Sequence, residues 1–260
     1  MIPFSLDQVE YFLLIFVRIS TTIALLPIFG SQAVPVQLKV ALSLILALIL
    51  FNSVMSIGPV TSQPLSTGTF IMLIVKEAAV GLGIGFVSSL LFTAVQFAGR
   101  LIDTEIGFGF VELMDPFTDE PVTVLGQLQV IIFTILFLLF NGHYFLILAI
   151  QKSFELVPLM NVHFPSGQLA FHVTALVGNV FVLAIKFSAP IYVTLVLTEL
   201  SLGVVARTVP QINIFFVGLP LKIAVGLGSA IIVLPLLASF FQRMVEALIQ
   251  DIWKLLYLMS

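Results

Sequence analysis

Apolar residues dominate this chain in six long runs, separated by shorter segments rich in proline, glycine and polar residues. The runs cover residues 11–29, 38–57, 70–98, 124–150, 170–200 and 221–248. They are continuously apolar and do not alternate with a period of two, which favours helices over the strands of a membrane barrel. A helix needs about 20 apolar residues to cross the hydrocarbon core of a bilayer, and most runs reach that length. The pattern predicts an all-α membrane protein with about six long apolar helices.

Several runs are longer than a bilayer requires, so we expect tilted, kinked or broken helical hairpins. The connecting segments are 30–37, 58–69, 99–123, 151–169 and 201–220. None is long enough to fold as a separate soluble domain, and we therefore expect residues 1–260 to form a single integral membrane domain.

Composition excludes several classes of function. The chain is 60% hydrophobic and only 9% charged, whereas a soluble domain is about 25% charged. Its ten basic residues are scattered, which argues against nucleic-acid binding. Cysteine is absent, the three histidines lack metal-ligand spacing, and no nucleophile elbow or phosphate-binding loop occurs. We expect no enzymatic activity, no cofactor and no metal.

Charged residues interrupt the apolar runs at Arg18, Lys76, Glu77, Lys186 and Glu199. A lone charge at mid-bilayer costs about 2.5–3.5 kcal/mol on insertion scales, so such residues usually pair or face a protein interior. One interpretation is pairing within or between subunits of a complex. The other is an ion or proton path through a transporter.

The connector 99–123 combines acidic and large apolar residues. Residues 103–120 hold six of the 13 acids of the chain and no lysine or arginine. The same stretch contains Phe108, Phe110, Leu113, Met114 and Phe117, with Gly107 and Gly109 as flexible points. Solvation explains the acids but not the apolar residues. A loop that projects apolar side chains into a pore explains both, and so does a loop anchored on neighbouring subunits.

Four segments in order resemble the FliR family of type III secretion export-gate proteins, which serve flagella and virulence systems. They are VRISTTIALLPIFGSQAVPVQLKVALS, KEAAVGLGIGF, the acidic connector with Asp115-Pro116, and TELSLGVVARTVPQINIFFVGLPLKI. The last is long and unusual, and together the segments span nearly the whole chain. The resemblance leans towards the flagellar branch.

The resemblance implies a core subunit of an export gate in the bacterial inner membrane, at the flagellar basal body. Its partners would be FliP-like and FliQ-like subunits in a helical assembly, other membrane proteins of the export apparatus, and membrane lipid. Unfolded exported proteins would pass through the channel. Residues 1–169 would correspond to a FliP-like part, and residues 170–260 to a FliQ-like helical hairpin.

The resemblance also implies roles for individual residues. The apolar residues of the acidic loop would seal the closed pore as a plug, Gly107 and Gly109 would let the loop swing, and Glu112 and Asp115 would meet passing chains or neighbouring subunits. Pro210, Gln211 and Asn213 would form the turn of the last hairpin. The structural and interface charges would be Arg18, Lys76, Glu77, Glu199, Arg207 and Lys222.

Two other functions remain open at this point. A stand-alone ion or small-molecule transporter would use Lys76, Glu77 and Glu199 along its path. A membrane-embedded enzyme would need a catalytic cluster near one membrane face, and the sequence contains no recognisable one.

Overall fold

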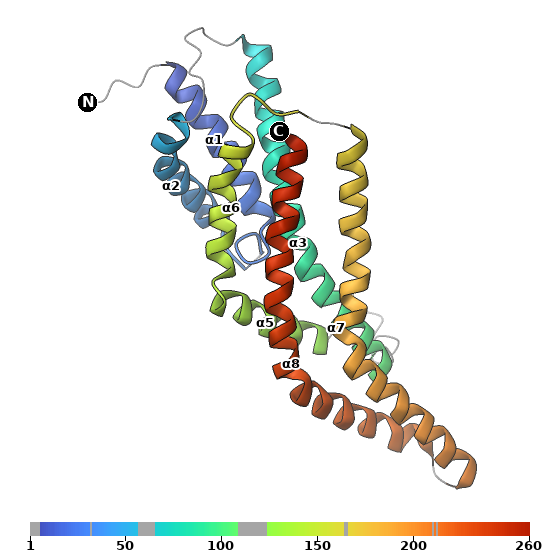
Figure 1. Cartoon of the computed structure of the whole chain (residues 1–260). Coiled ribbons are helices and arrows are strands. Elements are labelled where there is room, and N and C mark those ends of the chain that lie inside the picture. Colours follow the sequence, from blue (N-terminus) through green and yellow to red (C-terminus); the bar gives the residue numbers. More distant parts are fainter. Residues whose placement is uncertain are drawn as a thin grey trace. The chain divides into compact units, whose positions relative to one another are not determined.

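The computed structural model describes residues 6–31, 33–56, 66–108, 124–163, 166–209, 211 and 213–260. Its helices (Figure 1) are α1 Leu6–Leu25, α2 Val36–Met55, α3 Thr67–Ile106, α5 Val124–Leu139, α6 Gly142–Leu156, α7 Ser166–Thr208 and α8 Ile214–Met259. These ranges contain no strand. Within the described ranges, five helices are long and apolar enough to cross a membrane, or six spans if α5 and α6 count as one broken span. The prediction of an all-α membrane fold is confirmed.

Helices extend further than the apolar runs indicate. Residues 99–106 continue α3, and residues 201–208 continue α7, although both stretches were predicted as connector. The cause is that a polar or charged residue lowers hydropathy without stopping a helix. In the opposite sense, the apolar run 124–150 is broken at Asn141, which has a left-handed φ of 57°.

The chain divides into two compact units. The first comprises residues 1–91, 141–177 and 245–260, and the second comprises 92–140 and 178–244. Helices α3, α7 and α8 each contribute one segment to each unit. The proposed correspondence of 1–169 and 170–260 to two partner-like parts concerns sequence segments, and it stays a prediction.

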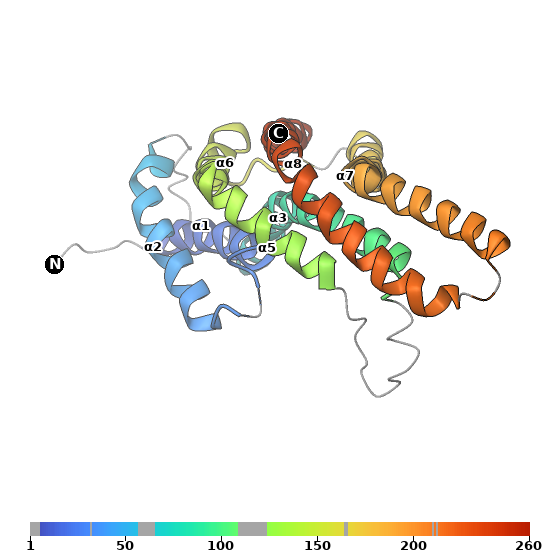
Figure 2. The same ribbon diagram turned by 90° about the horizontal axis from the view of Figure 1, so that it is seen from below.

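In the first unit, α1 packs against α2 and also meets α3 and α6 (Figures 1 and 2). The buried residues of α1 recur every three or four positions, as expected for one face of a helix. They are Tyr11, Leu14, Ile15, Arg18, Ile19, Thr22 and Ile23. A charged residue, Arg18, therefore lies within the apolar stripe and requires a partner there.

In the second unit, α7 and α8 form a hairpin that packs on the end of α3 and on α5 (Figure 2). Its core holds a buried aliphatic cluster of Ile102, Ile106, Leu125, Ile191 and Leu195. Phenylalanine rings pack edge to face elsewhere in the unit: Phe133 lies 4.8 Å from Phe92 and 4.3 Å from Phe241 between ring centroids.

Helix α2 buries only a narrow stripe of small and apolar residues, Ser43, Ala47, Leu50 and Val54. Most of its other residues are apolar, and many of them are exposed; Val36 and Ile49, for example, are 69% and 65% exposed. A helix that is apolar all round is buried in a larger protein or in lipid. The fold therefore presents apolar surface that needs a non-aqueous neighbour.

Candidate functional site

Arg18 of α1 forms a buried ion pair with Glu77 of α3. Its Nη2 lies 2.5 Å from Glu77 Oε2, and its Nε donates a hydrogen bond of 2.6 Å to the same oxygen. Both side chains are completely buried. Since a lone buried charge is strongly unfavourable, each residue supplies the opposite charge that the other requires. Two of the intramembrane charges thus pair within one chain.

The same guanidinium binds the end of α6. Arg18 Nη1 donates hydrogen bonds of 2.9 Å to the carbonyl oxygens of Ser153 and Val157. The last carbonyls of a helix lack intrahelical partners, and a cation is favourable there. The guanidinium also lies over the ring of Phe154, 4.4 Å from its centroid. Arg18 therefore joins α1, α3 and the end of α6 at one point.

The segment that follows α6 is held by two neighbouring charges of α3. Glu77 Oε1 accepts a hydrogen bond of 3.4 Å from the N–H of Met160. Lys76 Nζ donates a hydrogen bond of 3.2 Å to the carbonyl of Val162. The neighbouring residues Lys76 and Glu77 thus both contact the backbone of this connecting segment.

Glycines allow α3 to approach α1 closely beside the ion pair. A Cβ at Gly81 would overlap the carbonyl oxygen of Arg18 and Oγ1 of Thr21. A Cβ at Gly85 would lie 2.5 Å from Cβ of Leu25. Small residues often permit such close approach between membrane helices, and Gly81 and Gly85 do so here.

A second charge cluster joins the α7–α8 hairpin to the end of α3. Lys222 Nζ lies 3.2 Å from Oε2 of Glu199 and 3.7 Å from Oε1 of Glu105. It also donates a hydrogen bond of 3.2 Å to the Glu105 carbonyl. Glu199 pairs with Lys222 and not with Arg207, which lies nearer in the sequence. Arg207 is exposed and has no ion pair within the described part of the chain.

Helix α3 ends in a Schellman motif at the start of the predicted plug loop. Gly107 has a left-handed φ of 102°, its N–H donates to the Thr104 carbonyl over 3.2 Å, and the N–H of Phe108 donates to the Asp103 carbonyl over 3.1 Å. Phe108 packs against the buried aliphatic cluster of the second unit. Gly107 therefore ends the helix in a left-handed conformation, and Phe108 adds an apolar contact directly after it.

Asp103 caps the next helix. Its Oδ1 accepts a hydrogen bond of 3.0 Å from the N–H of Leu125, and its Oδ2 accepts one of 2.9 Å from the N–H of Gly126. The sequence pattern predicts Asp103 and Glu105 as acids of the loop, but both belong to α3. The cap has no local sequence signal, because a capping residue is normally sought immediately before its helix.

Most residues predicted for the plug lie outside the described residues, and for them the role stays a prediction. These are Gly109, Phe110, Glu112, Leu113, Met114, Asp115 and Phe117. In the predicted hairpin turn, Gln211 lies between α7 and α8, and the Asn213 carbonyl accepts hydrogen bonds from the N–H groups of Phe216 and Val217. Pro210 lies outside the described residues.

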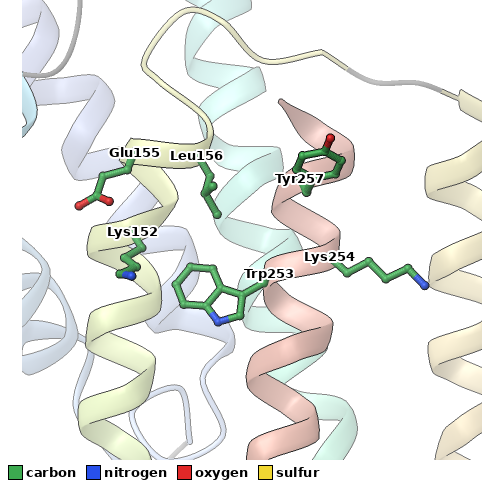
Figure 3. A pocket seen from close by; sticks show the side chains of 6 residues that line it. All are labelled: Lys152, Glu155, Leu156, Trp253, Lys254 and Tyr257. Atoms are coloured by element: carbon green, nitrogen blue, oxygen red, sulfur yellow. The ribbon is translucent and has the colours of Figure 1, made fainter.

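A pocket of about 430 Å³ opens between α6 and α8 in the first unit (Figure 3). It is lined by Lys152, Glu155, Leu156, Trp253, Lys254 and Tyr257. Lys152 Nζ lies 5.4 Å from the centroid of the Trp253 indole, towards which it points in Figure 3. None of the residues predicted from the sequence lines this pocket.

Comparison with known proteins adds an independent line of evidence. The family model of bacterial export proteins, family 1, matches residues 9–248. The flagellar biosynthetic protein FliR of Bacillus subtilis (strain 168) is 32% identical over 260 residues, which cover 98% of each chain. Its namesake in Escherichia coli (strain K12) is 28% identical over 92% of this chain and 88% of its own. That of Aquifex aeolicus (strain VF5) is 31% identical over 86% and 85%.

Proposed function

This chain belongs to the bacterial export proteins, family 1, and on that premise we propose that it is a membrane-embedded subunit of the flagellar protein-export apparatus. One observation carries the proposal: the similarity to a flagellar biosynthetic protein extends over 98% of both chains. The resemblance inferred from four sequence segments is confirmed by this match. The role proposed is that of a channel subunit in the inner membrane at the basal body, and not that of an enzyme.

The proposed partners are several FliP-like and FliQ-like subunits. The apolar surface of the chain supports a shared assembly, since large apolar residues remain exposed along α2, α7 and α8. Lipid covers some of such a surface in any membrane protein. The α7–α8 hairpin is the segment proposed to correspond to a FliQ-like subunit, and unfolded flagellar proteins are the proposed cargo.

We propose that the loop between α3 and α5 is the plug of the channel. Its apolar residues, Phe108, Phe110, Leu113, Met114 and Phe117, would form the seal. What supports this is the combination of acids and large apolar residues in one connector. The helix end at Gly107 adds a defined point from which the loop departs.

The geometry favours this role over a stand-alone transporter. A proton path would need carboxylates that can bind and release protons, and between which protons can pass directly or through water. Glu77, one of the two central candidates, is completely buried, and both of its oxygens are engaged by Arg18 and by the N–H of Met160. This arrangement suits a structural ion pair better than a relay.

Deletion of the gene in its flagellated host tests the proposal. We expect loss of motility and loss of flagellar proteins from the culture medium, and we expect a plasmid copy of the wild-type gene to restore both. A control copy with an early stop codon shows that restoration needs the protein. A deletion strain that still exports flagellar proteins would contradict the proposed function.

A further inference from the structure

Asp103 occupies an unusual position at the end of α3. It lies one turn before the last helical residue, Ile106, and only 4% of its surface is exposed. Both carboxylate oxygens accept hydrogen bonds from backbone N–H groups of the first turn of α5. The first N–H groups of a helix have no intrahelical partners and favour a negative charge. Asp103 supplies both the partners and the charge, from a different helix.

The backbone of the same residue binds the residues that directly follow α3, Gly107 and Phe108. The Asp103 carbonyl accepts hydrogen bonds from Gly107 N–H at 3.2 Å and from Phe108 N–H at 3.1 Å. The chain therefore leaves α3 bonded to the carbonyl of Asp103. It enters α5, which begins at Val124, bonded to the carboxylate of Asp103.

The surroundings give this arrangement little freedom. A Cβ at Gly99 would overlap Cα of Gly126, so the backbones of α3 and α5 touch one turn from Asp103. Ile102, Ile106 and Leu125 are buried together in the aliphatic cluster beside it. Hydrogen bonds to a carboxylate are stronger in such apolar surroundings than in water, and an unpaired partner is more unfavourable there.

We infer that Asp103 is a positioning residue that fixes both ends of the 109–123 connection at a single point of α3. This point is the fixed base, at which the end of α3 and the start of α5 do not separate. Its importance for export rests on the function proposed above. The fixation itself does not, and the two can be tested separately.

Distances between spin labels test the fixation directly. The chain has no cysteine, so the pair Thr104→Cys and Gln127→Cys places labels on exposed positions of α3 and α5 and at no other position of this chain; partner subunits carry no reactive cysteine in the strain used. The protein is labelled within the export complex purified from cells. We expect one narrow distance distribution for the otherwise unchanged chain. Arg100→Gln, an exposed change one turn before Asp103, is the matched control and should leave it narrow.

Substitutions of Asp103 should widen the distribution in a set order. Asp103→Asn keeps the size but turns an N–H donor towards a backbone N–H, so one hydrogen bond is lost and the single narrow peak broadens. Asp103→Ala loses both bonds and should broaden it further. If the alanine variant does not assemble, the asparagine variant supplies the answer. A distribution as narrow as that of the control in every Asp103 variant that assembles would overturn the inference.

Ion leakage through the membrane, measured in the same strains, separates this inference from the proposed function. Broadening together with leakage supports both the fixed base and the plug. Broadening with an impermeable membrane and a normal complex mass supports the fixed base and contradicts the plug. A narrow distribution contradicts the fixed base whatever the leakage.

Discussion

Replacing one member of the Arg18–Glu77 ion pair by a neutral residue should strongly lower the free energy of unfolding. Glu77→Gln keeps the side-chain shape but leaves the completely buried guanidinium without a counter-charge. Arg18→Met leaves the Glu77 carboxylate without a counter-charge and also removes the donor to the Val157 carbonyl. Breaking a buried pair from one side typically lowers the free energy of unfolding by about 3–5 kcal/mol.

The double variant distinguishes pairing from two independent effects. With both charges gone, only neutral groups are left unpaired, at about 1–3 kcal/mol for each group. The loss in the double variant should therefore be smaller than the sum of the two single losses by about 3 kcal/mol or more, a factor of about 100 in the unfolding equilibrium. Additive losses would show that the two residues do not act as a pair.

The chain offers a convenient assay for this cycle. Its one tryptophan, Trp253, lies in the same compact unit as the ion pair, so its fluorescence during denaturation by SDS in mild detergent reports that unit. Glu155→Gln is the matched control, because Glu155 is exposed on α6 and has no ion pair in the described ranges. It should change the unfolding free energy by no more than about 0.5 kcal/mol. Single variants of the pair that unfold like this control would show that the ion pair does not stabilise the fold.

Three further predictions address other parts of the molecule. Gly81→Ala should lower the unfolding free energy by about 1–3 kcal/mol, because the added Cβ pushes α3 away from α1. The control Gly178→Ala, where nothing lies within 4 Å of the added Cβ, should raise the unfolding free energy by up to about 1 kcal/mol. Equal changes of the two variants in thermal denaturation would contradict close packing at Gly81. Lys222→Met leaves Glu105 and Glu199 without their shared cation, so a protease should cleave the α7–α8 hairpin faster than in the control Arg207→Met. Equal cleavage rates would show that the cluster of Lys222, Glu105 and Glu199 does not stabilise the hairpin. Replacing Phe110 and Met114 together with glycine should make cells leak ions or small solutes, and an impermeable membrane in a strain that assembles the complex would contradict the seal.

Hydropathy was sufficient for the helical class, because continuous apolar runs have one structural solution in a membrane. It was insufficient for helix ends. Residues 99–106 carry Asp103 and Glu105 and so resemble a connector, yet they remain helical until Gly107 adopts a left-handed conformation. A helix end depends on backbone geometry, and glycine at that point was the usable signal.

Pair partners were even less accessible from the sequence. Glu77 and Arg18 are 59 positions apart, and Lys222 and Glu105 are 117 positions apart. The basic residues that lie nearest to Glu77 and Glu199 in the sequence among those named above, Lys76 and Arg207, are not their ion-pair partners in the described ranges. The intramembrane charges themselves were recognisable, since each is unfavourable unless satisfied. Which charge satisfies which other depends on the packing of helices and is not encoded in any local spacing.

Native mass spectrometry of the co-expressed complex tests whether this chain is a subunit of a protein-export complex. The tagged chain is expressed with its FliP-like and FliQ-like neighbours, extracted in mild detergent and weighed intact. We expect one discrete complex that contains a single copy of this chain with several copies of each partner. A monomer or homodimer that carries neither partner would show that the chain is not a subunit of such a complex.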